Sequence, residues 1–385
     1  MIHVCFCFHD KTGHYCKFTG TTMLSLFENT YSEVTVHILH DNTLTPDNRD
    51  KFIYLAGRYG QLVKFYNVEK LCADKLAEFM KLFPAMQTSR VTSAGFFKFL
   101  IPDVLSNEIS KCIYLDSDLI INIDIKELWK INLANKPVAA ANEIELVGAP
   151  WIIPKRYLVK NEYVAYEDYF NSGVIVMDLN SLRQSEKLIM EGIRFRGEHP
   201  CDFFDQDIWN YLFSKNYLKL SRKFNFFVDQ ARKTSQICPA IYHYVSITLK
   251  LDMNDAFNQL WLNHLVKTPW FDADIVCNIY KSIVELETIH LGRMREFSSL
   301  MSGKIRTFVV NKGNLDRVKE DFFIRDDEEI IITEENELHQ DLIDKMKNLR
   351  EENIFFVAVP NIYKELKDAG LVENKDFFNA FLFYV

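Results

Sequence analysis

Two aspartates separated by one residue follow a short apolar run that ends at Leu115. Side chains at positions i and i+2 of an extended segment point to the same side, so the carboxylates of Asp116 and Asp118 can converge on one hard cation. Such a cation can bridge two phosphates and stabilise the charge on a leaving diphosphate. The alternative is a turn in which both side chains bond to their own backbone. The pair alone leaves both interpretations open.

The elements that must position this pair alternate between strands and helices. Apolar runs predict the strands and helical spacing of apolar side chains predicts the helices; in chain order these are a strand at 2–8, a helix at 21–29, a strand at 33–39, a helix at 49–59 and a strand at 112–115. Alternation of this kind indicates crossover connections and a sheet rich in parallel pairs. Ligands of such sheets gather beyond the carboxyl ends of the strands, where the aspartates are expected.

The composition is that of an ordinary globular protein, with 48% hydrophobic and 25% charged residues among 385. A net charge of −8 argues against nucleic acid, and no nucleic-acid partner is expected. The apolar N-terminus lacks a basic leader and is too short to span a membrane, and eight scattered cysteines fit a reducing compartment, so we expect a cytoplasmic protein. Cys5 and Cys7 could share a strand face as metal ligands, but no second Cys or His pair accompanies them, and packing is expected.

The length favours one large domain and one smaller domain. We place a large domain at 1–282, a helical linker at 283–303 and a small α/β module of unknown role at 304–385. The strands predicted for the module lie at 306–310, 329–332 and 354–359, and Leu338, Leu342, Met346 and Leu349 share one helical stripe. The module has no Gly-rich dinucleotide fingerprint, so packing or interaction is its expected role. The aromatic tail at 377–385 is expected to pack on the module, with contact to lipid or a partner as the alternative.

Further segments extend the pattern around the aspartates. They are Phe96 to Pro102, Cys112 to Asp118, Tyr169 to Leu179, Phe204 to Asn210 and the pair His243-Tyr244. In this order they resemble glycosyltransferase family 8, the retaining sugar transferases typified by bacterial lipopolysaccharide galactosyltransferases and glycogenin. The resemblance covers most of residues 1–270. It implies a nucleotide-diphospho-sugar transferase fold of the GT-A type, with a mixed sheet flanked by helices and a smaller C-terminal α/β module.

The resemblance implies a metal site and a donor site. The metal ligands would be Asp116, Asp118 and His243, a set that favours Mn2+ and leaves Mg2+ as the alternative because imidazole is a softer ligand than magnesium prefers. The donor contacts would be Asp10, Tyr15, Lys98, Ser117, Asn171, Ser172 and Lys250. His9 or His14 are alternatives near the N-terminus, and a solvated surface role is the alternative for Lys250. Asn171 to Gly173 are expected to form a small-residue turn before a strand.

The resemblance also implies catalytic roles for Asp205 and Gln206 beside the anomeric carbon. Retention of configuration needs either a nucleophile on the opposite face or same-face attack within an ion pair. Because Gln206 is a poor nucleophile, we favour same-face attack and keep Asp207 as the alternative nucleophile. The structural alternative for this stretch is the first turn of a helix, where Asp is favoured by capping and by the helix dipole.

The function implied is transfer of a hexose, galactose or glucose, from a UDP-sugar to a carbohydrate acceptor with retention of configuration. The acceptor would belong to lipopolysaccharide or capsule, in lipid-linked form, at the inner face of a membrane with which the protein associates peripherally. Two features depart from the family: Lys98 replaces its usual Arg, and the loop after His243 lacks its Gly. The alternatives are a catalytically silent carbohydrate-binding or scaffold protein and a sugar nucleotidyltransferase, which should carry a Gly-rich loop near the first strand.

Replacement of Asp118 by Ala tests the metal assignment. We expect the Asp118→Ala variant to lose sugar transfer, because one of the cation's carboxylate ligands is missing, and to keep its fold. Transfer activity and the circular dichroism spectrum are the measurements. Undiminished activity would contradict the metal site.

Overall fold

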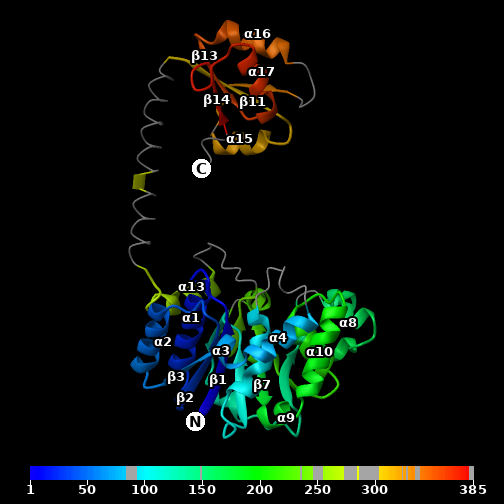
Figure 1. Cartoon of the computed structure of the whole chain (residues 1–385). Coiled ribbons are helices and arrows are strands. Elements are labelled where there is room, and N and C mark those ends of the chain that lie inside the picture. Colours follow the sequence, from blue (N-terminus) through cyan, green and yellow to red (C-terminus); the bar gives the residue numbers. More distant parts are fainter. Residues whose placement is uncertain are drawn as a thin grey trace. The chain divides into compact units, whose positions relative to one another are not determined.

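The computed structural model describes residues 1–83, 93–147, 150–234, 236–245, 255–272, 284–285, 303–322, 324–326, 328–333 and 339–380. The chain divides into two compact units, Met1–Asp272 and Ala273–Val385 (Figure 1). Of the predicted linker at 283–303, only residues 284, 285 and 303 are among those described. None of the described helices is both long enough and apolar enough to cross a membrane.

A seven-stranded mixed sheet forms the centre of the first unit. Its strands, in spatial order, are β3 (Leu62–Asn67), β2 (Val34–His40), β1 (Ile2–Phe8), β4 (Lys111–Leu115), β7 (Phe170–Asp178), β6 (Val138–Asn142) and β8 (Tyr217–Leu220). The first four run parallel to one another, whereas β7 runs antiparallel to both β4 and β6. β6 and β8 are again parallel, so the sheet is rich in parallel pairs as expected, and the mixed α/β fold implied by the resemblance is confirmed.

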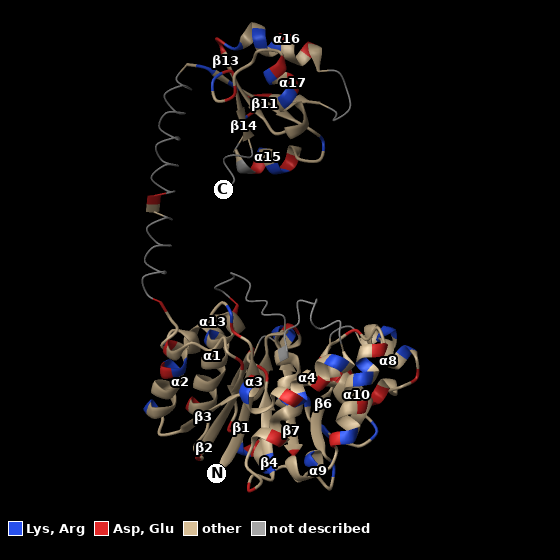
Figure 2. Ribbon diagram, in the orientation of Figure 1, with Lys and Arg blue, Asp and Glu red and all other residues tan. Residues whose placement is uncertain are grey.

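Helices cover both faces of this sheet because its strands bury both faces. Along β1, Val4 and Phe6 belong to one apolar core and Cys5 to the other, so the strand is a continuous apolar run. Helices α1 (His14–Glu28) and α2 (Pro46–Arg58) close the first core; α4 (Ala73–Leu82), α9 (Leu179–Arg183), α10 (Glu186–Glu198) and α11 (Asp205–Phe213) close the second. Charged side chains gather on helices and loops, whereas β1, β2 and β6 contain none (Figure 2).

Further helices of this unit lie in the connections between the strands, except α13, which follows the last strand. They are α3 (Val68–Leu71), the 3-10 helix η2 (Ser93–Leu100), α5 (Ile101–Val104), α6 (Lys126–Trp129), α7 (Glu143–Leu146), α8 (Tyr157–Lys160), α12 (Val228–Ala231) and α13 (Ala256–Leu265). Among them, η2 and α7 contribute side chains to the site described below.

The segment that follows Asp118 belongs to a second sheet, of three strands: β5 (Leu119–Asn122), β10 (Ala240–His243) and β9 (Phe226–Phe227). Helix α1 holds β5 through hydroxyl side chains. Thr22 Oγ1 donates to the carbonyl of Leu119 (2.7 Å), and Ser25 Oγ accepts from a backbone N–H of the same strand (2.9 Å). β10 runs antiparallel to β5 with His243 opposite Leu119. This pairing brings His243 beside Asp118.

The strand predicted at 2–8 is confirmed, but both predicted helices begin earlier than expected. The carboxylate of Asp10 accepts hydrogen bonds from the N–H groups of Tyr15 (3.2 Å) and Cys16 (2.9 Å). These bonds stabilise the first turn of α1, which starts at His14 and not at residue 21. Thr45 likewise caps α2 by accepting from the N–H of Asn48 (3.2 Å). Each cap satisfies donors that a helix leaves unpaired at its N-terminus.

The second unit is a smaller α/β module. Its sheet has four parallel strands in the order β12 (Glu329–Ile332), β11 (Ile305–Val310), β13 (Asn353–Val357) and β14 (Phe377–Asn379). The described helices are α15 (Leu315–Asp321), α16 (Gln340–Leu349) and α17 (Tyr363–Asp368). The three predicted strands are confirmed, and Leu342 and Met346 are buried as the predicted stripe requires. The start of the aromatic tail pairs with β13, whereas Leu338 and residues 381–385 lie outside the described residues.

A buried histidine on β2 links stability to pH. His37 Nε2 lies 3.0 Å from His3 Nδ1, and His37 Nδ1 lies 3.0 Å from the hydroxyl of Tyr66. Burial, together with His3 and Lys64, lowers the pKa of His37 to about 3. An unfolded chain binds this proton near its ordinary pKa of about 6.5. Stability from the neutral ring is therefore fully present above about pH 6.5 and is lost as the pH falls towards about 3.

We predict that the free energy of unfolding of the His37→Gln variant falls less steeply with decreasing pH than that of the wild type. The difference in free energy of unfolding between the two proteins should shrink as the pH is lowered from neutral, because only the wild type takes up this proton on unfolding. Urea unfolding at a series of pH values measures it, with exposed His14→Gln as the control. Parallel profiles for wild type and His37→Gln would contradict the assignment.

Candidate functional site

A cavity of about 550 Å³ opens beyond the carboxyl ends of the central strands. It collects side chains from distant segments: His9 and Tyr15 after β1, Lys98 from η2, Asp116 and Asp118 after β4, Asn171, Ser172 and Gly173 from β7, Asp205 and Gln206 from α11, and His243 from β10. This is the edge at which open α/β sheets bind ligands. Most of the residues predicted for the site therefore meet in one cavity.

Three of these side chains form a candidate metal centre. The potential ligand atoms of Asp116, Asp118 and His243 all lie within 4.8 Å of one another. His243 Nε2 is 3.3 Å from Asp118 Oδ1 and 3.9 Å from Asp116 Oδ2. Adjacent ligands of a cation bound at about 2.1 Å lie roughly 3 Å apart, so a small divalent cation fits among the three with a slight adjustment. The two carboxylates and the imidazole suit a cation that accepts both oxygen and nitrogen.

Burial and mutual charge shift the proton affinities of this centre. Burial raises the pKa of Asp116, with Lys98 acting against this and Asp118 adding to it. Burial alone would lower the pKa of His243, but Asp118 and Asp116 raise it above its ordinary value. Metal ligands must be deprotonated before they bind a cation. A cation that enters this centre therefore displaces protons.

Gly173 leaves the space that His243 occupies. A Cβ atom at this position would lie 2.5 Å from His243 Cε1 and 3.0 Å from both His243 Nδ1 and Asp116 Oδ2. No side chain can be added there unless the imidazole or the carboxylate moves. The glycine within β7 is therefore required by the packing of His243 and Asp116 and not by the strand.

Lys98 is a buried cation in the cavity wall. Its Nζ donates to Asp205 Oδ2 and lies 3.7 Å from Asp116 Oδ1 and 4.3 Å from the centre of the Tyr114 ring. Burial alone would lower the pKa of Lys98, but Asp205 and Asp116 raise it. Burial would raise the pKa of Asp205, but Lys98 lowers it below its ordinary value. The pair is therefore held in its charged form, as buried ion pairs require.

The amide of Gln206 is fully engaged by the protein. Oε1 accepts from Asn171 Nδ2 (2.8 Å) and from the N–H of Ser172 (3.3 Å), and Nε2 donates to Glu143 Oε2 (3.1 Å) and to the hydroxyl of Tyr169 (3.2 Å). An amide has two lone pairs and two N–H hydrogens to share. The side chain is therefore a fixed part of the cavity wall.

Asp207, the predicted alternative nucleophile, is turned away from the cavity. Oδ1 accepts from the Tyr169 hydroxyl (2.6 Å), and Oδ2 accepts from the N–H of Phe203 (2.7 Å) at the start of α11. Burial raises the pKa of Asp207. These contacts favour the structural alternative, a residue that organises a helix start, over the nucleophile.

Two predicted donor contacts also point away from the cavity. Ser117 Oγ is hydrogen-bonded to Thr19 Oγ1 on α1 (2.8 Å), because successive side chains of an extended segment take opposite sides. Asp10 is occupied with the start of α1, whereas its sequence alternative His9 and the predicted Tyr15 line the cavity. The expectation that Ser117 and Asp10 face a donor in this cavity is therefore not supported.

The segment from Asn171 to Gly173 lies inside β7, and not in a turn before the strand as the sequence predicted. Asn210 on α11 extends the strand at its start. Its Oδ1 accepts from the N–H of Phe170 (2.8 Å), and its Nδ2 donates to the carbonyl of the same residue (2.7 Å). Residues 246–254, which include Lys250, lie outside the described residues.

Three supporting side chains were not predicted. Asn225 accepts from His243 Nδ1 (2.9 Å), and Arg156 donates to Glu143 Oε1 (3.2 Å). Burial raises the pKa of Glu143 to about 7 against the opposing effect of Arg156. Glu143 follows an apolar strand as Asp116 does, which is a signal that could have identified it. Asn225 and Arg156 carry no comparable signal.

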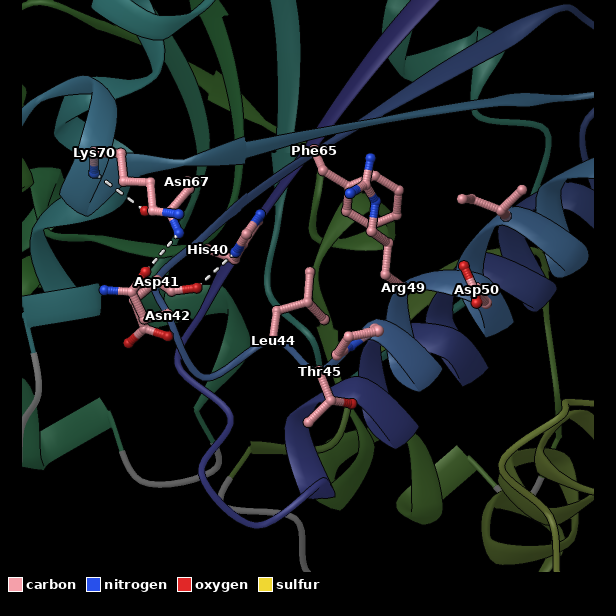
Figure 3. Close-up of a pocket in the computed structure, with 12 residues that line it drawn as sticks. His40, Asp41, Asn42, Leu44, Thr45, Arg49, Asp50, Phe65, Asn67 and Lys70 are labelled. Atoms are coloured by element: carbon pink, nitrogen blue, oxygen red, sulfur yellow. Dashed lines mark hydrogen bonds between the residues drawn. The ribbon is translucent and has the colours of Figure 1, made fainter.

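A second pocket of about 640 Å³ lies at the carboxyl ends of β2 and β3 (Figure 3). Its lining includes Asp41, and the Arg49 guanidinium lies 5.1 Å from the centre of the Phe65 ring. Asp41 accepts from Thr43 and is hydrogen-bonded to His9 Nδ1, and these contacts lower the pKa of Asp41 although burial acts to raise it. The His9 ring at the edge of the first cavity is thus fixed from this second pocket.

The Gly173→Ala variant tests whether the centre binds a cation. We expect it to weaken binding of Mn2+ at least tenfold, because the added methyl group displaces His243 or Asp116 and so disrupts the ligand set. Titration calorimetry with Mn2+ measures the affinity.

Gly57→Ala is the matched control. Gly57 lies within α2, and a Cβ there would meet nothing within 4 Å, so the change should leave Mn2+ binding unaltered and slightly raise the melting temperature. Equal Mn2+ affinity in Gly173→Ala and wild type would show that the three side chains are not the ligands.

Solved structures with this fold include two glycosyltransferases. The galactosyltransferase LgtC, solved with donor and acceptor sugar analogs, superposes with a TM-score of 0.56 at 16% identity, covering 71% of this chain and 98% of LgtC. The bifunctional glycosyltransferase WbbM superposes with a TM-score of 0.54 at 18% identity, covering 70% of this chain and 50% of WbbM. These similarities establish the GT-A type fold of the first unit.

Relatives found by sequence also include a glycosyltransferase. General stress protein A of Bacillus subtilis is 26% identical over 231 residues, which are 58% of this chain and 73% of that protein. Lipopolysaccharide 1,3-galactosyltransferase of Salmonella typhimurium is 23% identical over 290 residues, which are 71% of this chain and 81% of the relative. The family model matches residues 4–250, well over half of the sequence, and the chain therefore belongs to glycosyl transferase family 8.

Proposed function

We propose that this chain is a retaining hexosyltransferase that moves galactose or glucose from a UDP-sugar to a glycan acceptor with the help of Mn2+. Family membership supports glycosyl transfer over nucleotidyl transfer. The observation that carries the proposal is the convergence of Asp116, Asp118 and His243 in a cavity that also holds Lys98 and Asp205.

Asp116, Asp118 and His243 would hold the cation in this proposal. When bound, Mn2+ would neutralise the diphosphate and stabilise its charge as the sugar leaves. Mg2+ is the alternative, and the imidazole ligand favours Mn2+ over it. His9 and Tyr15 also line the cavity, and their rings would contact the nucleoside of the donor.

Lys98, Ser172 and Asp205 would orient the transferred sugar. Ser172 Oγ donates to Asp205 Oδ2 (3.0 Å), the oxygen that also accepts from Lys98. A carboxylate held by two donors has a fixed direction, and its remaining acceptor capacity suits sugar hydroxyls. Asn171 lines the same wall.

The side chains around the reaction centre favour same-face attack. Gln206 has its hydrogen-bonding capacity filled, and Asp207 faces away, so neither is poised as a nucleophile. In same-face attack the acceptor oxygen bonds to the anomeric carbon as the bond to the diphosphate breaks. The acceptor's proton passes to the leaving phosphate oxygen. The anomeric configuration is retained, as one of the two known routes to retention requires.

The acceptor part of the proposal rests on relatives. One of them is named a lipopolysaccharide galactosyltransferase, and LgtC was solved with an acceptor sugar analog. We propose a glycan of lipopolysaccharide or capsule type, lipid-linked at the inner face of a membrane. Transfer is proposed for the domain at 1–282, and the module at 304–385 is proposed to serve packing or interaction.

Thermal melting against nucleotides tests the donor and the metal. We expect UDP and UDP-hexoses to raise the melting temperature only when Mn2+ is present, because a ligand that binds the native state stabilises it. GDP and CDP, with and without Mn2+, are the comparison ligands, and the Asp118→Ala variant should show no shift. No shift of the wild type with any nucleotide would favour the catalytically silent alternative.

A further inference from the structure

Three buried amide side chains connect the candidate metal centre to the start of α11. Asn225 Nδ2 donates to Asn171 Oδ1 (2.7 Å), Asn171 Nδ2 donates to Gln206 Oε1 (2.8 Å), and Asn225 Oδ1 meets His243 Nδ1 (2.9 Å). The exposed fraction is 0% for Asn225, 9% for Asn171 and 6% for Gln206. Buried polar groups of this kind must find partners inside the protein, so the chain has few alternative arrangements.

Backbone groups of β7 determine which end of each amide faces which neighbour. The N–H of Gly173 lies 3.0 Å from one side-chain atom of Asn171, and a backbone N–H can only donate, so that atom is the oxygen. By the same argument, the side-chain atom of Gln206 that lies 3.3 Å from the N–H of Ser172 is the oxygen Oε1. The NH2 group of Asn171 must then face Gln206, as it does. The orientation of both amides is therefore set by backbone N–H groups, which can donate a hydrogen bond but cannot accept one.

The orientation of Asn171 in turn determines the orientation of Asn225 beside the candidate metal centre. The oxygen of Asn171 needs a donor, so Asn225 presents its NH2 group to Asn171 and its oxygen to His243. An amide oxygen accepts only, so His243 Nδ1 must carry a hydrogen. In the neutral ring the other nitrogen, Nε2, then holds the lone pair, and Nε2 is the atom that faces Asp118 and Asp116.

We propose that Asn225 is a positioning residue that keeps His243 in the tautomer able to bind a metal, and that β7 transmits this choice through Asn171. The proposal rests on the proposed function in that it takes Asp116, Asp118 and His243 as the metal ligands. A partner that fixes the tautomer and orientation of a ligating histidine contributes to metal affinity without touching the metal. Gly173 then has two roles. It leaves space for the His243 ring, and its N–H orients Asn171, which in turn orients Asn225.

Two variants with the same number of non-hydrogen side-chain atoms as asparagine separate the role of Asn225 from simple packing. Asn225→Leu removes the acceptor for His243 Nδ1, and Asn225→Asp keeps it. We expect the Mn2+ dissociation constant of the full-length protein, with UDP present, to rise about 10- to 100-fold in Asn225→Leu. In Asn225→Asp the rise should be smaller, because the carboxylate still accepts from Nδ1–H; it no longer donates to Asn171 Oδ1, which keeps its bond from the N–H of Gly173. The electron paramagnetic resonance signal of free Mn2+ measures both.

Arg183→Ala is the control for loss of buried hydrogen bonds elsewhere in the first unit. Arg183 donates to the carbonyls of Pro102 and Ile109, away from the cavity. Its loss should lower the melting temperature and leave Mn2+ affinity unchanged. If Asn225→Leu binds Mn2+ as tightly as wild type, or if Asn225→Asp loses as much affinity as Asn225→Leu, the proposal is overturned.

The tautomer itself can be measured without metal, which separates this inference from the proposed function. Histidine labelled with 15N reports by nuclear magnetic resonance which ring nitrogen carries the hydrogen, and comparison with His243→Gln identifies the signal. At alkaline pH, where the ring is neutral, we expect the hydrogen of His243 to lie on Nδ1 in wild type, and we expect Asn225→Leu to be a mixture of the Nδ1–H and Nε2–H tautomers. A wild-type ring protonated on Nε2 overturns the inference. Absence of Mn2+ binding together with an Nδ1–H ring would overturn only the metal assignment.

Discussion

An excess of partly buried negative charge governs the site. Asp116, Asp118 and Asp205 line the cavity with Lys98 as the cation among them, which leaves two negative charges when these four groups are ionised. Burial raises the pKa of Asp116, and repulsion from Asp118 adds to this effect while Lys98 opposes it. A divalent cation removes the excess at once. The surrounding elements, from η2 to β10, can be understood as the means of holding this charge distribution in place against its own repulsion.

The sequence contains most of what is needed to find the fold and the centre of the site. Alternation of apolar runs identifies β1, β2 and β4, because strands buried on both faces are continuous stretches of apolar residues. The spacing of Asp116 and Asp118 identifies a pair on one side of an extended segment, and the ordered segments around them identify the partners. His243 is found only through the family pattern, because pairing of β10 with β5 is a long-range event that local periodicity does not encode.

The rest depends on how side chains share hydrogen bonds, which spacing does not reveal. Ser117 was expected at the donor, but its hydroxyl faces Thr19 because α1 packs against that side of the chain. Asn225 contributes through one contact to His243, and nothing in its local sequence distinguishes it from an asparagine in a turn. Asn171 was expected in a small-residue turn, but β7 already begins at Phe170, whose backbone pairs with the Asn210 side chain of α11. Such residues are recognised when the partners are known.

Helix α1 links a cavity residue to the segment that carries the carboxylates, and this has a consequence for how the site keeps its shape. Tyr15 in its first turn lines the cavity, and Thr22, seven residues later, bonds to the backbone that follows Asp118. A helix rises 1.5 Å per residue, so these two positions are separated by about 10 Å along a rod that cannot stretch. The helix therefore fixes the distance between Tyr15 and the segment that carries the carboxylates. A change where Asp10 accepts from the N–H groups of Tyr15 and Cys16 would be carried along α1 to the backbone beside Asp118.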